Sequence, residues 1–247
     1  MTQTLAGQTV LITGGARRLG AATARALHAA GANVVIHHLT STQEAGTLVA
    51  ALNQARAGSA TLAQADLLDV ARLPGLVEAA VSHYGRLDIL IINASTFYPT
   101  PIGAVSLGQF EDLLGTNLRA PLFLAQAAAP ELRRRGGLIL NMVDIHGMKP
   151  LKNYPVYSSA KAALIMLTKA LARELAPEVR VNGIAPGPVL FPADVDAAMQ
   201  AQIIDKTLLR RAGEPQDIGQ AAVYFATMAP YVTGQILAVD GGRSQSG

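Results

Sequence analysis

Tyr157 and Lys161 stand four residues apart in the sequence. The apolar spacing around them predicts a helix over Val156–Leu175, and positions i and i+4 of a helix share one face, so both side chains can reach one cleft. A nearby ammonium stabilises a phenolate and lowers the tyrosine pKa from its usual value of about 10. This pattern predicts that Tyr157 serves as an acid catalyst near neutral pH. The alternative is coincidence, because many exposed helices carry this spacing.

A carboxylic acid precedes this pair in the chain. Asp144 lies thirteen residues before Tyr157 and follows a short apolar run, Leu138–Met142, that is typical of a buried strand. A carboxylate is a poor partner for a carbonyl oxygen that becomes an alkoxide, because like charges repel. A carboxylic acid, or a carboxylate that relays a proton, suits reduction of a C=N bond, whose nitrogen must gain a proton. The alternative is that Asp144 only caps the turn after the strand.

A glycine-rich turn, with the sequence TGGARRLG over residues 13–20, connects the first predicted strand to the first predicted helix. Gly14 and Gly20 allow a tight turn and a close approach of the backbone to a ligand. The helix that begins near Leu19 offers unpaired N–H groups and the positive end of its dipole. A turn of this kind between a strand and a helix predicts binding of a dinucleotide pyrophosphate.

The second predicted strand ends without an acidic residue. Aspartate or glutamate at that point would bind the 2′-hydroxyl of NAD and repel a 2′-phosphate. Here the strand ends at His37 and His38, with Ser41 after them, and Arg17 and Arg18 lie in the glycine-rich turn. Guanidinium, histidine and hydroxyl donors suit a 2′-phosphate, so we predict NADPH as the cofactor. The alternative for the two histidines is that they only finish a surface strand.

Short aliphatic runs alternate with longer helical patterns along the whole chain. This alternation predicts right-handed βαβ units, and hence a single Rossmann-like, doubly wound α/β domain over residues 1–247, with about seven parallel strands flanked by helices. The predicted strands are Val10–Thr13, Val34–His37, Thr61–Ala65, Ile89–Asn93, Leu138–Met142, Arg180–Ile184 and Ile236–Val239. The predicted helices are Leu19–Ala29, Thr42–Ala55, Leu73–His83, Gly108–Ala128, Val156–Leu175 and Asp217–Ala226.

The longest irregular stretch runs from Pro186 to about Ala197, and segments of this length in a domain are often functional. The arginines over 133–135 precede two glycines, a pattern typical of a helix end rather than of a nucleic-acid patch.

Composition excludes several classes of protein. The 247 residues are 50% hydrophobic and 15% charged, which argues against disorder. No cysteine is present, which excludes disulfides, thiolate metal sites and cysteine nucleophiles, and we expect no metal. The scattered charges, with a net of +3, argue against nucleic-acid binding. The N-terminus lacks the pattern of a signal peptide, and no apolar run reaches the roughly 18 residues of a membrane span, so we expect a cytoplasmic protein.

The glycine-rich turn together with the Tyr-x-x-x-Lys spacing resembles the short-chain dehydrogenase/reductase family over essentially the whole chain. The resemblance implies roles for further residues. Asp66 and Leu67 would contact the adenine, and Lys161 would also hold the nicotinamide ribose. Asn117 would complete a catalytic tetrad by binding a water at a helix distortion, although it could equally be a buried helix residue. The family resemblance also implies that two turns contact the cofactor. One contains Asn93, Ala94 and Ser95, and the other contains Pro186 and Gly187. The resemblance also implies a homotetramer.

Two departures from the usual family pattern resemble its pteridine reductase branch: Arg18 replaces a glycine and Asp144 replaces a serine. The segment 93–101 also resembles that branch, in which its aromatic residue, here Phe97, stacks on the pterin. Phe97 could otherwise fill the core. Tyr154 would line the outer pocket. The substrate contacts implied in this way are Arg18, Ser95, Phe97, Asp144, Tyr154 and Tyr157.

We therefore expect an NADPH-dependent enzyme that transfers a hydride to a C=N bond of a pterin, such as dihydrobiopterin, dihydromonapterin or dihydrofolate. One alternative is an NADPH-dependent carbonyl reductase such as a 3-oxoacyl-carrier-protein reductase, which would be expected to carry serine at 144 and glycine at 18. A second alternative is a non-catalytic NADP(H)-sensing protein, a class that commonly loses the tyrosine or the lysine.

Overall fold

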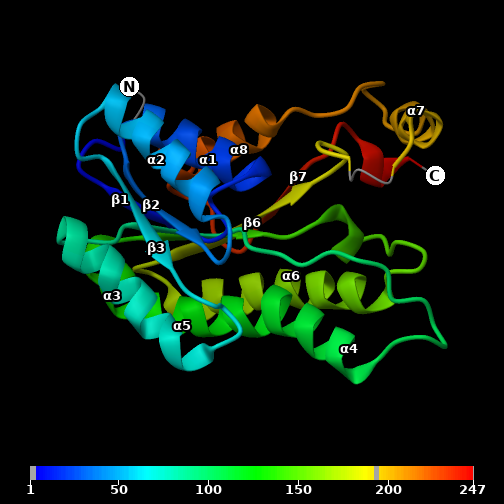
Figure 1. Cartoon of the computed structure of the whole chain (residues 1–247), viewed down its shortest axis with the longest axis horizontal. Helices are drawn as coiled ribbons and strands as arrows, with labels where there is room; N and C mark the ends of the chain where they lie inside the picture. Colours follow the sequence, from blue (N-terminus) through cyan, green and yellow to red (C-terminus); the bar gives the residue numbers. More distant parts are fainter. Residues whose placement is uncertain (1–3, 192–194, 247) are drawn as a thin grey trace.

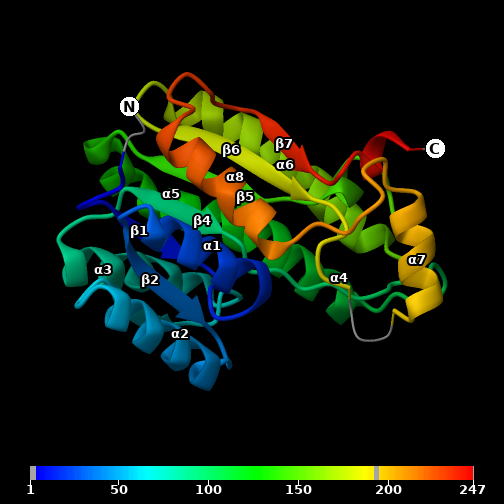
Figure 2. The same ribbon diagram turned by 90° about the horizontal axis from the view of Figure 1, so that it is seen from above.

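The computed structural model describes residues 4–191 and 195–246, and within them one parallel sheet of seven strands forms in the order β3-β2-β1-β4-β5-β6-β7. This arrangement confirms the predicted doubly wound α/β fold. The strands are β1 (Thr9–Ile12), β2 (Asn33–His38), β3 (Ala60–Gln64), β4 (Ile89–Ile92), β5 (Leu138–Met142), β6 (Arg180–Pro186) and β7 (Ile236–Val239). Figure 2, which views the molecule from above, shows this order from β2 to β7.

Helices cover both faces of the sheet (Figure 1). One layer contains α1 (Arg18–Ala29), α2 (Thr42–Ala55) and α8 (Pro215–Thr227). The opposite layer contains α3 (Leu73–Tyr84), α5 (Ala120–Arg135) and α6 (Pro155–Leu175). Because both faces are covered, the central strands are apolar throughout rather than alternating, and β1 and β4 are buried along their whole length.

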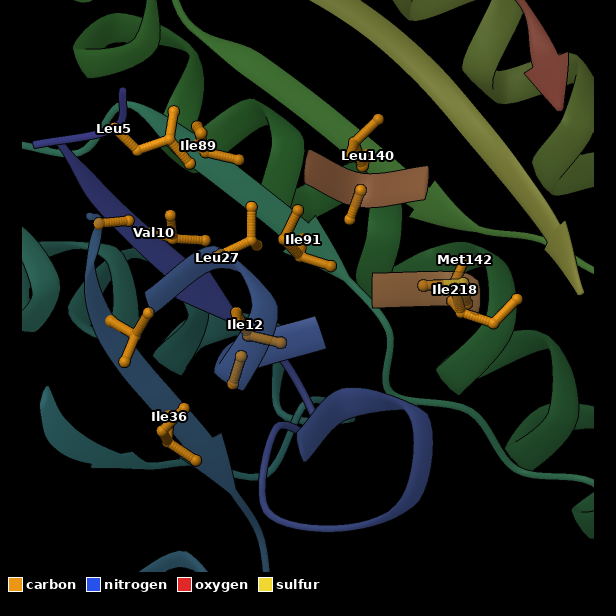
Figure 3. Packing of buried hydrophobic residues seen from close by; sticks show 14 of the residues in the cluster. Leu5, Val10, Ile12, Leu27, Ile36, Ile89, Ile91, Leu140, Met142 and Ile218 are labelled. Carbon is orange, nitrogen blue, oxygen red and sulfur yellow. The ribbon is translucent and has the colours of Figure 1, made fainter. Parts of the chain in front are cut away.

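The cluster between the sheet and the layer of α1, α2 and α8 illustrates how the core is filled (Figure 3). Val10 and Ile12 of β1 lie beside Ile36 of β2, and Leu27 of α1 packs onto them. Ile218 brings α8 onto the same cluster near the carboxyl end of β5. Each such side chain contributes roughly 1.5–3 kcal/mol when it is fully buried. This packing holds the strand ends, and hence the turns after them, in fixed relative positions.

One predicted helix differs from the structure, and one observed helix was not predicted. The helix predicted over Gly108–Ala128 is divided into α4 (Leu107–Leu114), a π-helical turn η2 (Gly115–Arg119) and α5, which continues to Arg135 and ends at Gly136 with a left-handed φ of 63°. The arginines over 133–135 thus occupy a helix end, as predicted. The irregular stretch predicted from Pro186 to about Ala197 includes 192–194, which lie outside the described residues. It is followed by α7 (Ala197–Asp205), a short helix with no buried residue. Its weak apolar pattern explains why the sequence did not reveal it.

Other short elements are the 3-10 turns η1 (Val70–Arg72), η3 (Ile145–Gly147) and η4 (Arg243–Gln245). Among the described residues, no helix has both the length and the apolar content needed to cross a bilayer.

Candidate active site

A cavity of about 800 Å³ runs along the carboxyl ends of the strands, where open α/β sheets bind ligands. The structure brings almost all of the predicted site residues to its wall, although they come from six strand ends and the helices after them. The predicted residues that line it are Gly14, Arg17, Arg18, Leu19, Gly20, His37, His38, Ser41, Asp66, Leu67, Asn93, Ala94, Ser95, Phe97, Asp144, Tyr154, Tyr157, Lys161, Pro186 and Gly187. Asn117 is the predicted residue that does not line it.

Asp144, Tyr157 and Lys161 meet in the middle of this cavity. The Tyr157 hydroxyl donates a hydrogen bond to Asp144 Oδ2 over 2.7 Å, and Asp144 Oδ1 accepts the backbone N–H of His146 over 2.7 Å. Asp144 therefore caps η3 and partners Tyr157 at the same time, so the cap is present and the catalytic role stays a prediction. Lys161 Nζ donates to the carbonyl of Met142 over 2.9 Å and lies 5.7 Å from the Tyr157 ring centre.

The pKa of Tyr157 moves in the direction opposite to the one expected from the nearby lysine. Burial of the phenol and the adjacent Asp144 carboxylate raise the pKa of Tyr157 well above 10. Burial also lowers the pKa of Lys161 to about 8, although the charge of Asp144 opposes this shift. The expectation of a lowered tyrosine pKa is therefore wrong for this structure. Burial and a partnering carboxylate, neither of which the spacing of two residues reveals, decide the sign.

Asn93, directly after β4, holds the glycine-rich turn in place. Its amide Nδ2 donates to the carbonyls of Thr13 over 2.9 Å and Gly14 over 3.0 Å. Gly20 lies in the first turn of α1, where an added Cβ would lie 2.2 Å from Gly14 O and 2.6 Å from Asn93 Nδ2. The turn is therefore packed against the end of β4, and glycine at position 20 is a steric requirement. This close packing leaves the start of α1 open toward the cavity.

His37 supports the same turn instead of facing a phosphate. Its ring Nδ1 accepts the backbone N–H of Gly14 over 3.1 Å, and Nε2 lies 3.0 Å from the carbonyl of Ala65. Burial lowers the pKa of His37, which keeps the imidazole neutral, as this pair of bonds requires. Both ring nitrogens are engaged within the protein, so the predicted phosphate contact of His37 does not fit this geometry. The sequence cannot distinguish the two roles, because this bond joins Gly14, in the turn after β1, to a residue of β2 that lies far from it in the chain.

Three other predicted residues in or beside the glycine-rich turn remain available to a ligand. Arg17 forms only an exposed ion pair with Glu44 over 3.4 Å. Arg18 has a left-handed φ of 51°, the conformation for which glycine is usual, and its guanidinium donates to the carbonyl of Leu190 over 3.0 Å. His38 is buried, and its Nδ1 has no partner among the described residues. A buried polar atom without a partner favours occupation by a ligand or water.

Asn117 lies on the π-helical turn η2 that interrupts the α4–α5 segment, so the helix distortion implied by the family resemblance is present. The side chain is buried, and its Nδ2 donates to the carbonyls of Thr96 and Leu113 over 3.0 Å. Its Oδ1 accepts the Ser95 hydroxyl over 2.7 Å. In this structure Asn117 thus positions the 95–96 turn. The water-binding role stays a prediction.

Phe97 lies at the cavity wall between two tyrosines. Its ring stacks on Tyr154 with centres 4.6 Å apart and meets Tyr157 edge-on at 4.8 Å. The side chain is 41% exposed, which excludes the alternative that Phe97 fills the core. An aromatic side chain that is partly exposed at the cavity wall and braced by two tyrosines is one against which a planar heterocycle can pack.

Comparison with known proteins places this geometry in a family. A family model described as enoyl-(acyl carrier protein) reductase matches residues 14–244. The chain belongs to the short-chain dehydrogenase/reductase family. It is 37% identical to pteridine reductase 1 of Leishmania tarentolae, with 99% of each chain covered. It is also 33% identical to a 3-oxoacyl-[acyl-carrier-protein] reductase of Synechocystis, over 96% of this chain and 97% of the relative.

A solved structure supports the same assignment. The chain is similar to a blue fluorescent protein from a metagenomic library in complex with NADPH, with a TM-score of 0.90 and 34% identity over 98% of this chain and 99% of the other. As a member of the short-chain dehydrogenase/reductase family, the protein is an NAD(P)-dependent oxidoreductase. The residues present fit this cofactor, because the turn around Gly20 leaves no room for a side chain and the start of α1 lies open beside it.

This reductase also lines its cavity with residues that the sequence analysis did not single out. They gather at the end of the cavity away from the glycine-rich turn and come from η3, the segment after it, α7 and the C-terminal turn. They are His146, Leu151, Met199, Ile203 and Arg243. The rule that ligands bind at the carboxyl ends of parallel strands also applies to the last predicted strand and could have identified Arg243.

Proposed function

We propose that this protein is an NADPH-dependent pteridine reductase, which reduces a C=N bond of a dihydropterin to give the tetrahydro form. The observation that supports it most strongly is the hydrogen bond of 2.7 Å between Tyr157 and Asp144. It puts a carboxylate where carbonyl reduction would develop negative charge on oxygen, an arrangement that disfavours a ketone substrate. The similarity to a pteridine reductase at 37% identity favours the same conclusion.

The reaction needs one hydride and one proton. The reduced nicotinamide supplies the hydride to the carbon of the C=N bond when it is bound. Tyr157 holds its proton at neutral pH, because its pKa lies well above 10. In the proposed step the ring nitrogen takes a proton from Asp144 as Tyr157 passes its own proton to Asp144 along their hydrogen bond, and solvent then reprotonates Tyr157. Phe97 offers a stacking face for the pterin ring, worth about 1–3 kcal/mol by analogy with base–aromatic stacking. Lys161 lines the same cavity and would hold the ribose of the cofactor.

Replacement of Asp144 tests the substrate. Asp144→Ser recreates the residue expected of a carbonyl reductase and leaves the glycine-rich turn unchanged. We expect kcat/KM for dihydrobiopterin to fall by roughly two to three orders of magnitude, about 2.7–4 kcal/mol by analogy with loss of one preorganised polar group. Dihydrobiopterin and an acetoacetyl thioester are assayed in parallel by NADPH oxidation. A serine variant that reduces the pterin as well as the parent does would instead favour the carbonyl reductase.

The preference for NADPH over NADH is part of the proposal. The end of β2 carries no acid, and Arg17 pairs only with a solvent-exposed glutamate. A 2′-phosphate at this point gains a cationic partner and meets no carboxylate on β2. We expect NADPH to bind at least tenfold more tightly than NADH, about 1.4 kcal/mol, in a fluorescence titration. Arg17→Gln should narrow that ratio, and equal affinities in the parent protein would contradict the preference.

We also propose a homotetramer. Large apolar side chains are exposed on α4 and α5 and again on α8 and the segment after it. Exposed apolar patches of this kind are typical of subunit contacts. They include Leu107, Phe110, Leu122, Tyr224 and Met228. Light scattering coupled to size-exclusion chromatography measures the assembly mass, and a monomer at micromolar concentration would refute the tetramer.

A further inference from the structure

The cavity ends at a basic turn that follows β7. The strand order places β7 at the sheet edge far from β2, five steps away, or roughly 24 Å at about 4.8 Å per step. Arg243 begins η4, four residues after the end of β7, and we infer from this spacing that it lies too far from the β2 end to contact the adenosine part of the cofactor. It lies only two steps, or about 10 Å, from β5, after which Asp144 stands. Figures 1 and 2 both show this C-terminal turn beside α7.

The fold builds this turn so that Arg243 faces the cavity without a carboxylate of its own. Gly241 and Gly242 have left-handed φ values of 60° and 82°. The nearest acid in sequence, Asp240, is occupied: its Oδ1 accepts the N–H of Gly242 over 2.9 Å and its Oδ2 accepts the N–H of Ser244 over 2.7 Å. Asp240 thus shapes the turn instead of neutralising the guanidinium.

A second cation reaches the same turn. Arg243 Nη1 donates to the Ser246 hydroxyl over 3.0 Å, and Lys149 Nζ donates to the Ser246 carbonyl over 2.6 Å. Within residues 4–191 and 195–246, neither cation forms an ion pair with an acidic side chain. Two positive charges therefore meet at a neutral serine, and their mutual repulsion is relieved when an anion binds beside them.

We propose that Arg243 recognises a carboxylate on the tail of the substrate, so that the reductase prefers a pterin with an acidic side chain, of which dihydrofolate is an example, over one with a short neutral side chain. This inference rests on the proposed pterin reduction. With the ring on Phe97 and its reacting bond near Asp144, a tail must cross about 10 Å to reach the turn after β7. The aminobenzoyl spacer of a folate can cross that distance, and a three-carbon hydroxylated chain is too short. Guanidinium is the group that pairs best with a carboxylate.

The test compares dihydrofolate with dihydrobiopterin at saturating NADPH. The ratio of interest is kcat/KM for dihydrofolate divided by kcat/KM for dihydrobiopterin. We expect Arg243→Gln to lower this ratio about tenfold, which is the usual effect of losing one partly exposed charge-assisted contact. The change should appear as a higher KM for dihydrofolate, with kcat unchanged. Arg243→Lys should restore part of the ratio, because it keeps the charge. Added salt should lower the parent's ratio by screening the same contact. Arg133→Gln removes one equal charge at an exposed helix end outside the cavity and serves as the matched control.

Each outcome decides the question. A ratio unchanged in Arg243→Gln, or lowered equally in Arg133→Gln, overturns the recognition of the tail and leaves pterin reduction standing. A loss of NADPH affinity in Arg243→Gln, measured by titration, also overturns it, because Arg243 would then serve the cofactor. If the parent protein reduces neither pterin, the proposed function fails and this inference fails with it.

Discussion

The two ends of the cavity are built in different ways. At the cofactor end, backbone and buried side chains fix the site: His37 holds Gly14 N, Asn93 holds two turn carbonyls, and Gly20 has no space for a Cβ. At the substrate end, the wall comes from exposed segments, with Phe97 41% exposed and no buried residue in α7.

This difference has a physical consequence. A contact made by core-packed backbone cannot change without disturbing the sheet, whereas an exposed side chain on a turn can be replaced at little cost in stability. Cofactor binding is therefore tied to the fold itself. In the proposed function, substrate choice depends on a few side chains around Asp144, Phe97 and Arg243. Relatives of similar sequence are named for steroid, acyl and pterin substrates.

The largest expected effect comes from a methyl group at the cofactor end. In Gly20→Ala the new Cβ would lie 2.2 Å from Gly14 O, so the turn must move away from Asn93. We expect NADPH binding to be lost in a fluorescence titration and the free energy of unfolding to fall by about 1–3 kcal/mol, the usual cost of overpacking.

Gly46→Ala is the matched control for that substitution. Gly46 lies inside α2, and an added Cβ there meets nothing within 4 Å. We expect this variant to gain about 0.5–1 kcal/mol of stability, because alanine favours a helix, and to bind NADPH like the parent. Normal NADPH binding by Gly20→Ala would show that the cofactor end is less rigid than its contacts indicate.

Tyr157→Phe separates chemistry from binding. The substitution removes the hydroxyl that donates to Asp144 and keeps the ring that packs against Phe97. Loss of a general acid typically lowers the rate by 10²–10⁴-fold, so we expect about that fall in kcat, with NADPH affinity close to that of the parent. Rates and cofactor titrations are measured on the same preparation. A variant that turns over normally would mean that the proton reaches the substrate without Tyr157.

The smallest expected effect is a pH dependence of activity that is set by Lys161, which lies between the two ends of the cavity. As pH rises through about 8, the buried ammonium loses its proton, while the Tyr157 phenol, with a pKa well above 10, keeps its own. Activity that needs the ammonium is therefore present below about pH 8 and lost above it. We expect kcat/KM for NADPH, which reports groups of the free enzyme, to fall about tenfold per pH unit on that side. A profile that stays flat to pH 10 would contradict the lysine assignment.

Much of the architecture follows from local sequence signals. The predicted strands agree with the observed ones within two residues at each end, and Leu138–Met142 and Ile236–Val239 agree fully. Buried parallel strands are continuous apolar runs, and these runs are visible without any knowledge of their neighbours. The break at Asn117 was less visible, because a π-helical turn leaves the amphipathic pattern on both sides intact.

The sequence by itself determined the fold class, the glycine-rich turn and the pairing of Tyr157 with Lys161, because each depends on residues close together in the chain. Only the tertiary structure decided the sign of the Tyr157 pKa shift, since burial and the Asp144 carboxylate outweigh the effect expected of the lysine. It also decided that His37 holds Gly14 and that Arg243 reaches the substrate end of the cavity. Those roles arise from contacts between distant segments, and such contacts exist only after the strands have taken their order in the sheet.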